Sequence, residues 1–106
     1  MDALAVIADP TRRRILELLK DGDAAAGDLS DEFSISRPAV SRHLRVLREA
    51  GLVYSCVDGQ RRVYTLDARP LAELDAWLEP YRRFWAQRLD ALDTEIRRGR
   101  RNRRTA

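Results

Sequence analysis

The sequence is poor in the residue types that carry most catalytic, redox and metal-binding chemistry. Its 106 residues contain one cysteine, Cys56, and one histidine, His43. A lone cysteine excludes an intrachain disulfide, and protein zinc sites need thiolate or imidazole ligands in sets of three or four. There is also no glycine-rich phosphate loop and no nucleophile elbow, and the acidic residues are scattered along the chain. We therefore expect a protein that is not an enzyme and that uses no metal and no cofactor.

Long apolar stretches are also missing. No run approaches the roughly 20 residues that span a bilayer, and the N-terminal "MDALAVIADPTRRR" lacks the basic start and long apolar core of a signal peptide. A chain with a single cysteine also suits a reducing compartment. We expect a cytoplasmic protein that does not insert into a membrane.

Basic charge is present, and it is distributed unevenly. The net charge is +3, yet residues 97–106, "RRGRRNRRTA", carry six arginines and no acid. The other 96 residues hold 14 basic and 17 acidic side chains, a net charge of −3. Within them, residues 37–62 contain six arginines against Glu49 and Asp58. An acidic body with two basic zones favours a polyanionic partner.

Capping residues and apolar spacing predict three helices in the first half of the chain. In "DPTRRRILELLKDG", Asp9 is a good N-cap and Pro10 suits the first turn, so a helix should run to the stop signal "KDGD". A short helix is expected over 24–32. A third should begin after the N-cap Ser36 and end at Gly51, which can adopt the left-handed conformation that terminates a helix.

The second half of the chain predicts a hairpin and a long helix. The β-prone runs "LVYSCV" and "QRRVYTL" flank Asp-Gly, a strong hairpin signal. A helix should follow Asp67 and reach about residue 98, interrupted at Pro80. Short helices followed directly by a hairpin make a winged helix-turn-helix, a mostly α fold of the α+β class, here with a long C-terminal helix. We expect one domain over 1–98 and a disordered arginine-rich tail over 99–106, which either binds phosphates without sequence preference or only aids solubility.

The helix expected from Ser36 to Ala50 has two unlike faces. At about 100° per residue, Val40, Leu44 and Leu47 cluster on one side. Polar residues cluster on the other side, namely Arg37, Ser41, Arg45 and Arg48, with Arg42 at its edge. Arginine makes paired hydrogen bonds to guanine or binds phosphate, and serine allows close approach. Such a face fits the major groove of DNA.

A charged face often does no more than keep a helix solvated. Here, however, only Glu49 interrupts the basic face, so the alternating acids of a salt-bridged surface helix are missing. Arg61 and Arg62 also follow the hairpin turn, where a wing would reach phosphates or the minor groove. Both observations favour DNA binding. The alternative is a winged helix that binds protein or RNA without operator specificity.

Three segments, "ADPTRRRILELL", "SRPAVSRHLRVLREAGLV" and "DGQRRVYTL", resemble the ArsR-type winged-helix transcriptional repressors of bacteria. The resemblance runs from about residue 1 to residue 98. It implies a homodimeric repressor that binds an operator near its own promoter. It also implies which residues of the recognition helix and wing contact DNA: Ser36, Arg37, Pro38, Ser41, Arg42, Arg45, Arg61 and Arg62.

The same family is best known for metal sensing, and here the sequence departs from its pattern. One family site uses a Cys-x-Cys pair in the helix before the recognition helix, where this chain has Ala25 and Gly27. Another uses histidines and carboxylates on the last helix, which contains no histidine here. We expect a member that does not sense metal through either site, and no residue pattern identifies an inducer ligand.

The lone histidine and the lone cysteine each have a simple structural interpretation. His43 lies toward the apolar side of its helix, where packing at the edge of the core is favoured over a DNA contact or a pH switch. Cys56 alternates with Tyr54 in the first strand of the hairpin and is most simply a small strand residue. A redox role would need a second thiol from another molecule.

Apolar residues recur at spacings of three and four along the last helix, from Leu71 to Ile96. A helix over 71–98 would be roughly 40 Å long, more than the rest of the chain could cover, so a second copy should bury its outer part. The expected dimer contacts are Leu4, Ile7, Leu78, Tyr81, Trp85, Leu89, Leu92 and Ile96. The cluster of Trp77, Tyr81, Phe84 and Trp85 is favoured as interface core over an inducer site. Two recognition helices related by a two-fold axis could then read an inverted repeat in successive major grooves, roughly 34 Å apart.

Overall fold

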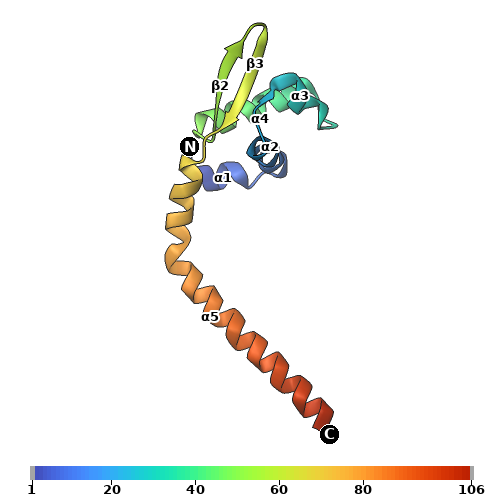
Figure 1. Cartoon of the computed structure of the whole chain (residues 1–106), viewed down its shortest axis with the longest axis vertical. Coiled ribbons are helices and arrows are strands. Elements are labelled where there is room, and N and C mark those ends of the chain that lie inside the picture. Colours follow the sequence, from blue (N-terminus) through green and yellow to red (C-terminus); the bar gives the residue numbers. More distant parts are fainter. Residues whose placement is uncertain (1, 106) are drawn as a thin grey trace. The chain divides into compact units, whose positions relative to one another are not determined.

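The computed structural model describes the backbone of residues 2–105 and the side chains of residues 2–100. In chain order its elements are α1 (Ala3–Ile7), α2 (Pro10–Lys20), β1 (Ala24–Ala25), α3 (Ala26–Asp31), α4 (Arg37–Glu49), β2 (Val53–Asp58), β3 (Arg61–Leu66) and α5 (Arg69–Thr105). Helices α3 and α4 are followed directly by the β2–β3 hairpin (Figure 1). The predicted order of the winged helix-turn-helix is therefore confirmed.

Helices α2 and α4 begin at the capping residues that the sequence indicates. Asp9 Oδ2 accepts a hydrogen bond from the backbone N–H of Arg12 at 3.0 Å, and Ser36 Oγ accepts one from the backbone N–H of Ala39 at 3.2 Å. Each cap satisfies an N–H group that has no partner within its own helix. Helix α4 ends before Gly51, whose φ of 76° lies in the left-handed region that glycine tolerates best.

The hairpin is the wing of the fold and closes with a two-residue turn. Asp58 pairs with Arg61, which leaves Gly59 and Gln60 in the turn, and Gly59 has a φ of 63°. A further strand, β1, pairs antiparallel with the other edge of β3, so the strand order is β1-β3-β2. The sequence predicted only helix over 24–32, and this part of the prediction is wrong. The two alanines of β1 have little intrinsic strand preference, and their strand exists through its pairing with β3.

The hydrophobic core fixes the rotation of α4 about its axis. Val40, Leu44 and Leu47 are at most 1% exposed, as their spacing predicted. The core also contains residues of α1, α2, α3, the wing and the turn before it: Val6, Ile15, Leu19, Leu29, Leu52, Val53 and Tyr64. Burial of one large aliphatic side chain stabilises a fold by about 1.5–3 kcal/mol, so turning α4 would be costly. The opposite face of α4 is thereby held toward solvent.

Helix α5 is continuous through Pro80 and past Gly99 to Thr105. The helix end predicted near residue 98, where a disordered tail was expected to begin, is therefore wrong. One glycine costs a helix only about 1 kcal/mol, and arginine is a good helix former. Chain contacts divide the molecule into two compact units, up to Leu74 and from Asp75 onward, and the single domain over 1–98 stays a prediction. No helix of the described residues is long and apolar enough to cross a membrane.

Candidate nucleic-acid interface

The exposed face of α4 carries the side chains that the sequence singled out. All six residues predicted to contact DNA from this region are exposed: Ser36, Arg37, Pro38, Ser41, Arg42 and Arg45. The Ser36 oxygen is occupied as the N-cap acceptor, but a hydroxyl that accepts can still donate its hydrogen. The packing of the opposite face against the core therefore presents several hydrogen-bond donors on one side of a rigid helix.

Weak ion pairs border this face without neutralising it. The Arg37 guanidinium lies 3.9 Å from the Asp31 carboxylate, and Arg45 Nε lies 3.8 Å from the Glu49 carboxylate. All four side chains are more than half exposed, and such pairs contribute only about 0–1 kcal/mol. Among the described residues, no acid lies within 4.0 Å of the remaining arginines of the face and wing, namely Arg42, Arg48 and Arg62. These guanidinium groups are available to an anionic ligand.

The two arginines of the wing have different surroundings. A terminal nitrogen of Arg61 donates to Asp28 Oδ2 of α3 at 2.9 Å. Successive side chains of a strand point to opposite faces, so Arg62 shares its face of β3 with Tyr64, which packs in the core. Arg61 thus ties the wing to α3, whereas Arg62 lies on the face that is directed toward α4.

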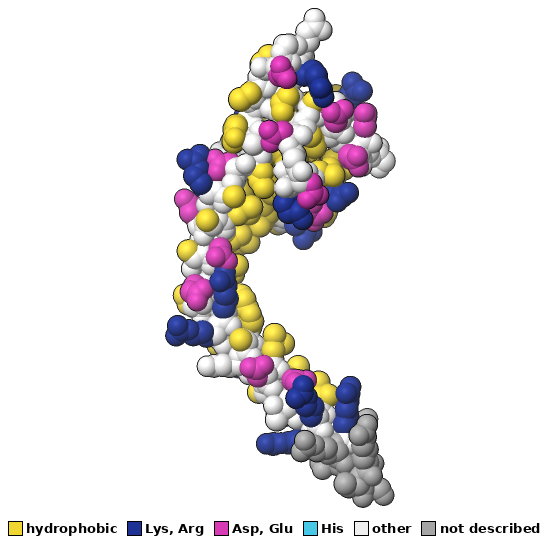
Figure 2. Space-filling view, in the orientation of Figure 1, with side chains coloured by type: hydrophobic (Ala, Val, Ile, Leu, Met, Phe, Trp, Pro, Cys, Tyr) yellow, Lys and Arg dark blue, Asp and Glu magenta, His cyan; other side chains and the backbone are white. Residues whose placement is uncertain are grey.

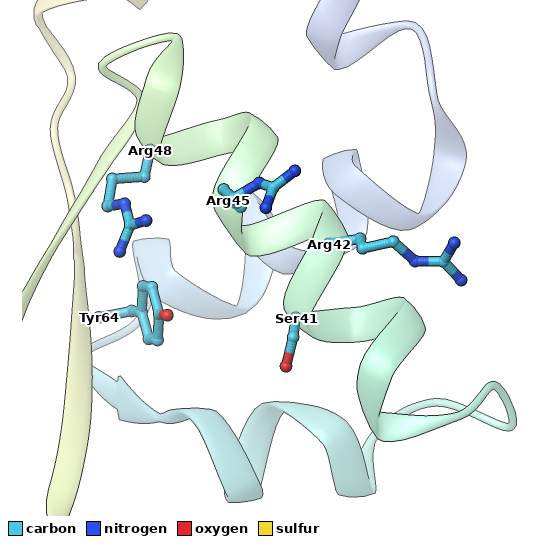
Figure 3. A pocket seen from close by; sticks show the side chains of 5 residues that line it. All are labelled: Ser41, Arg42, Arg45, Arg48 and Tyr64. Carbon is cyan, nitrogen blue, oxygen red and sulfur yellow. The ribbon is translucent and has the colours of Figure 1, made fainter.

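A shallow hollow of about 220 Å³ lies between α4 and β3. Figure 3 shows the side chains that line it, which are Ser41, Arg42, Arg45, Arg48 and Tyr64. The structure therefore brings three of the predicted contact residues together with two others. The sequence placed Arg48 on the basic face but not in the predicted site, and it missed Tyr64. Tyr64 lies two residues after Arg62 in a predicted strand, so the sequence pattern could have placed both side chains on the same face of the hairpin.

His43 is half-buried where α4 meets the start of α2. Its side chain is 23% exposed, and Nδ1 lies 3.9 Å from Asp9 Oδ2, in keeping with the predicted position at the edge of the core. The hydrogen bond from the backbone N–H of Arg12 lowers the pKa of Asp9, and the charge of protonated His43 acts in the same direction. Cys56 is exposed in β2. Over the described part of the chain there is no group of three or more potential metal ligands.

Comparison with known proteins identifies the family. The model of the arsR family of bacterial regulatory proteins matches residues 9–55. The transcriptional repressor SdpR of Bacillus subtilis (strain 168) is 43% identical over 72 residues, which cover 68% of this chain and 80% of SdpR. The HTH-type transcriptional regulator Rv2034 of Mycobacterium tuberculosis (strain ATCC 25618 / H37Rv) is 47% identical over 87 residues, covering 82% and 78%. The chain belongs to the arsR family.

Solved structures agree with this membership. The arsR-family chain is similar to a possible transcriptional regulator for arsenical resistance, with a TM-score of 0.74 and 45% identity over 90% of this chain and 96% of the other. An ArsR-like transcriptional regulator from Rhodococcus sp. RHA1 gives a TM-score of 0.68 at 32% identity, with 86% of each chain covered. The predicted family and winged-helix fold are confirmed, and the class of function with them: a DNA-binding transcriptional regulator, not an enzyme.

A second surface of this arsR-family chain is an apolar strip on α5. Seven side chains of the strip are each between 42% and 60% exposed, namely Trp77, Tyr81, Phe84, Trp85, Leu89, Leu92 and Ile96, and apolar side chains are visible along the helix in Figure 2. Of the other predicted dimer contacts, Leu4 is exposed, Leu78 is half-buried, and Ile7 packs against the core. Soluble proteins rarely leave a contiguous strip of this kind uncovered.

Proposed function

We propose that the chain is a homodimeric transcriptional repressor that inserts α4 into the major groove of an inverted-repeat operator. The observation that carries this proposal is the exposed basic face of α4, held outward by a buried face of Val40, Leu44 and Leu47. An α-helix is about 10–12 Å across with its side chains, which matches the roughly 12 Å width of the major groove.

The roles of the individual residues follow from their chemistry. Arg42 and Arg45 are the candidates for paired hydrogen bonds to guanine, and the small side chain of Ser41 on the same face leaves room for close approach. Pro38 lies in the first turn of α4, where its missing backbone N–H costs the helix no hydrogen bond. Its exposed ring can contact the DNA. The exposed residues beside it, Ser36 and Arg37, are suited to phosphate contacts, as is Arg62 on the wing.

Dimerisation rests on the apolar strip of α5. Covering the strip removes exposed aromatic and aliphatic surface from water, which is favourable in proportion to its area. The rings of Trp77 and Tyr81 are in contact at a centroid distance of 5.1 Å with their planes tilted by 41°, and the Arg88 guanidinium lies 4.6 Å from the Phe84 ring centroid. Such rigid aromatic groups are typical of interface centres. A second copy of the same helix would supply a complementary strip and give the two-fold symmetry that an inverted repeat requires.

The proposal is tested by titrating the purified protein into a labelled duplex taken from its own upstream region, at moderate ionic strength. We expect saturable binding that exceeds binding to a shuffled duplex. Arg42→Ala and Arg45→Ala should weaken it roughly tenfold or more each, the loss of one strong base or phosphate contact. Arg14→Ala, on α2 and paired with Glu17, removes the same charge away from the interface and should have little effect.

Preferential binding to RNA, or binding to no duplex, would instead support the alternative of a winged helix used for RNA or protein contacts. Equal losses in the Arg14→Ala control and in the α4 variants would show that only net charge matters.

A further inference from the structure

The hollow between α4 and β3 contains a tyrosine hydroxyl that has no hydrogen-bond partner among the described side chains. Tyr64 is only 7% exposed, and among the described residues no hydrogen bond involves its hydroxyl. Buried tyrosine hydroxyls usually have a hydrogen-bond partner. No side-chain polar atom of the described residues is both sealed from solvent and unsatisfied, so the hydroxyl opens into the hollow. Figure 3 shows it turned away from its strand into the space between Arg48 and Ser41.

We propose that this hollow binds a single phosphate group of the DNA backbone, with the Tyr64 hydroxyl as one of the hydrogen-bond donors to it. The proposal rests on the proposed function, because it follows from the placement of α4 in the major groove. The wing extends beside α4 toward the neighbouring minor groove. The two grooves are separated by a sugar-phosphate strand, so that strand must pass between α4 and the wing, where the hollow lies.

The lining suits a phosphodiester in charge and in donors. Three arginines and two hydroxyl-bearing residues line the hollow. Figure 3 shows the Arg48 guanidinium directed toward Tyr64, whereas the Arg42 guanidinium points away from it. Of these groups only Arg45 has an acid nearby, Glu49 at 3.8 Å, and Arg48 and Arg42 have none among the described residues within 4.0 Å. A phosphodiester carries one negative charge and several acceptor oxygens, and hydrogen bonds to charged acceptors are about twice as strong as neutral ones.

The decisive variant is Tyr64→Phe, which keeps the buried ring and removes only the hydroxyl. We expect it to weaken binding to every duplex by about tenfold or more per protomer, the loss of one hydrogen bond to a charged group. The slope of log affinity against log salt should stay unchanged because no charge is removed. Arg48→Ala should instead lower that slope by about 0.9 per protomer.

Tyr54→Phe is the matched control. Tyr54 pairs with Thr65 on the opposite face of the hairpin from Tyr64 and is 50% exposed, so the same deletion there should leave DNA binding unchanged. Parent-like binding by Tyr64→Phe would overturn the inference while the proposed function stands. Failure of the parent chain to bind any duplex would overturn the proposed function and this inference with it.

A second experiment separates a backbone phosphate from a free anion. Duplexes are made with one phosphate at a time replaced by an uncharged methylphosphonate. At one position per half-site, the replacement should weaken DNA binding by the parent protein. It should weaken binding by the Tyr64→Phe variant clearly less, because the phosphate and the hydroxyl form the same contact. The second arm replaces chloride by inorganic phosphate at constant ionic strength. Two results together would overturn the proposal and assign the hollow to a free anion. Inorganic phosphate would compete with DNA for the parent but not for Tyr64→Phe, and both proteins would be equally sensitive to every methylphosphonate.

Discussion

Arg61 and Arg62 are adjacent in β3 but occupy different electrostatic environments. Arg61 donates to Asp28 at 2.9 Å, and both side chains are largely exposed, so their pairing energy is small. A phosphate that approaches Arg61 must still displace or share the guanidinium with a carboxylate. Arg62 has no acid within 4.0 Å among the described residues. We therefore expect Arg62 to be the main phosphate ligand of the wing and Arg61 to contribute less, because Asp28 of α3 competes for its guanidinium.

Removal of each wing arginine tests this division. Arg62→Ala should lower the slope of log affinity against log salt by about 0.9 per protomer without changing base preference. Arg61→Ala should lower the slope less, and Asp28→Asn should raise affinity for all duplexes because it frees Arg61. Salt titrations on one duplex measure all three effects. Equal slopes for the two arginine variants would contradict the assigned roles.

Asp9 links the stability of the fold to pH through its role as the cap of α2. Its pKa in the folded chain lies below the ordinary value of 3.8, first because of the backbone N–H of Arg12. A lowered folded pKa means that the stabilisation is fully present above the unfolded value and is lost as the pH falls through the folded one. Asp9→Ala should lower the free energy of unfolding at pH 7 by about 1 kcal/mol, and this difference should shrink under strongly acidic conditions.

Urea unfolding of both proteins across the acidic range measures that difference. Asp9→Asn keeps a capping oxygen that does not titrate, so it should retain most of the stability at pH 7. A difference between the parent and Asp9→Ala that stays constant down to pH 2 would show that the carboxylate charge is irrelevant.

At the scale of the elements, the segments predicted correctly are those with local signals. These signals lie in or directly beside the elements they define. They are the caps at Asp9 and Ser36, the glycines with positive φ and the alternating β-prone runs. Strand β1 depends instead on pairing with a strand about 40 residues later, Ala24 with Tyr64. The hollow likewise requires α4 and β3 to pack together, which no single segment encodes. The end of α5 was misplaced because Gly99 is a weak stop without a following breaker.

Two glycines make a matched test of the helix boundaries. Gly51 has a φ of 76°, so Gly51→Ala should lower the free energy of unfolding by about 1–2 kcal/mol. Gly27 lies inside α3 with open space around its Cα, so Gly27→Ala should raise it by about 0.4–1 kcal/mol. Urea midpoints report both changes. Effects of the same sign would contradict the assigned end of α4.

Across the whole molecule, the charge distribution orients the protein toward DNA. Residues 37–62 carry six arginines and two acids, while the chain up to residue 96 is net negative. The acidic remainder disfavours approach to phosphate by other faces, and the basic zone attracts it, so the field of the protein aids correct encounter. In the proposed homodimer, two such faces related by a two-fold axis would combine modest contacts per protomer into one specific complex.

The dimer proposal is tested with a charge on the apolar strip. Trp85→Glu places a carboxylate among aromatic side chains and should yield monomers in analytical ultracentrifugation, with weaker binding to an inverted repeat. Gln87→Glu adds the same charge two residues away on the opposite side of α5 and should leave the dimer intact. A dimeric Trp85→Glu variant would remove Trp85 from the interface.

Selection of bound duplexes from a random pool tests the central claim most directly, because it reports sequence, symmetry and spacing together. We predict enrichment of an inverted repeat whose half-site centres are about one helical turn apart, roughly 34 Å or 10 base pairs, or a multiple of that distance. Arg42→Ala or Arg45→Ala should relax the preference at specific base pairs within each half-site. Recovery of no enriched sequence, or of a single half-site without symmetry, would contradict the account.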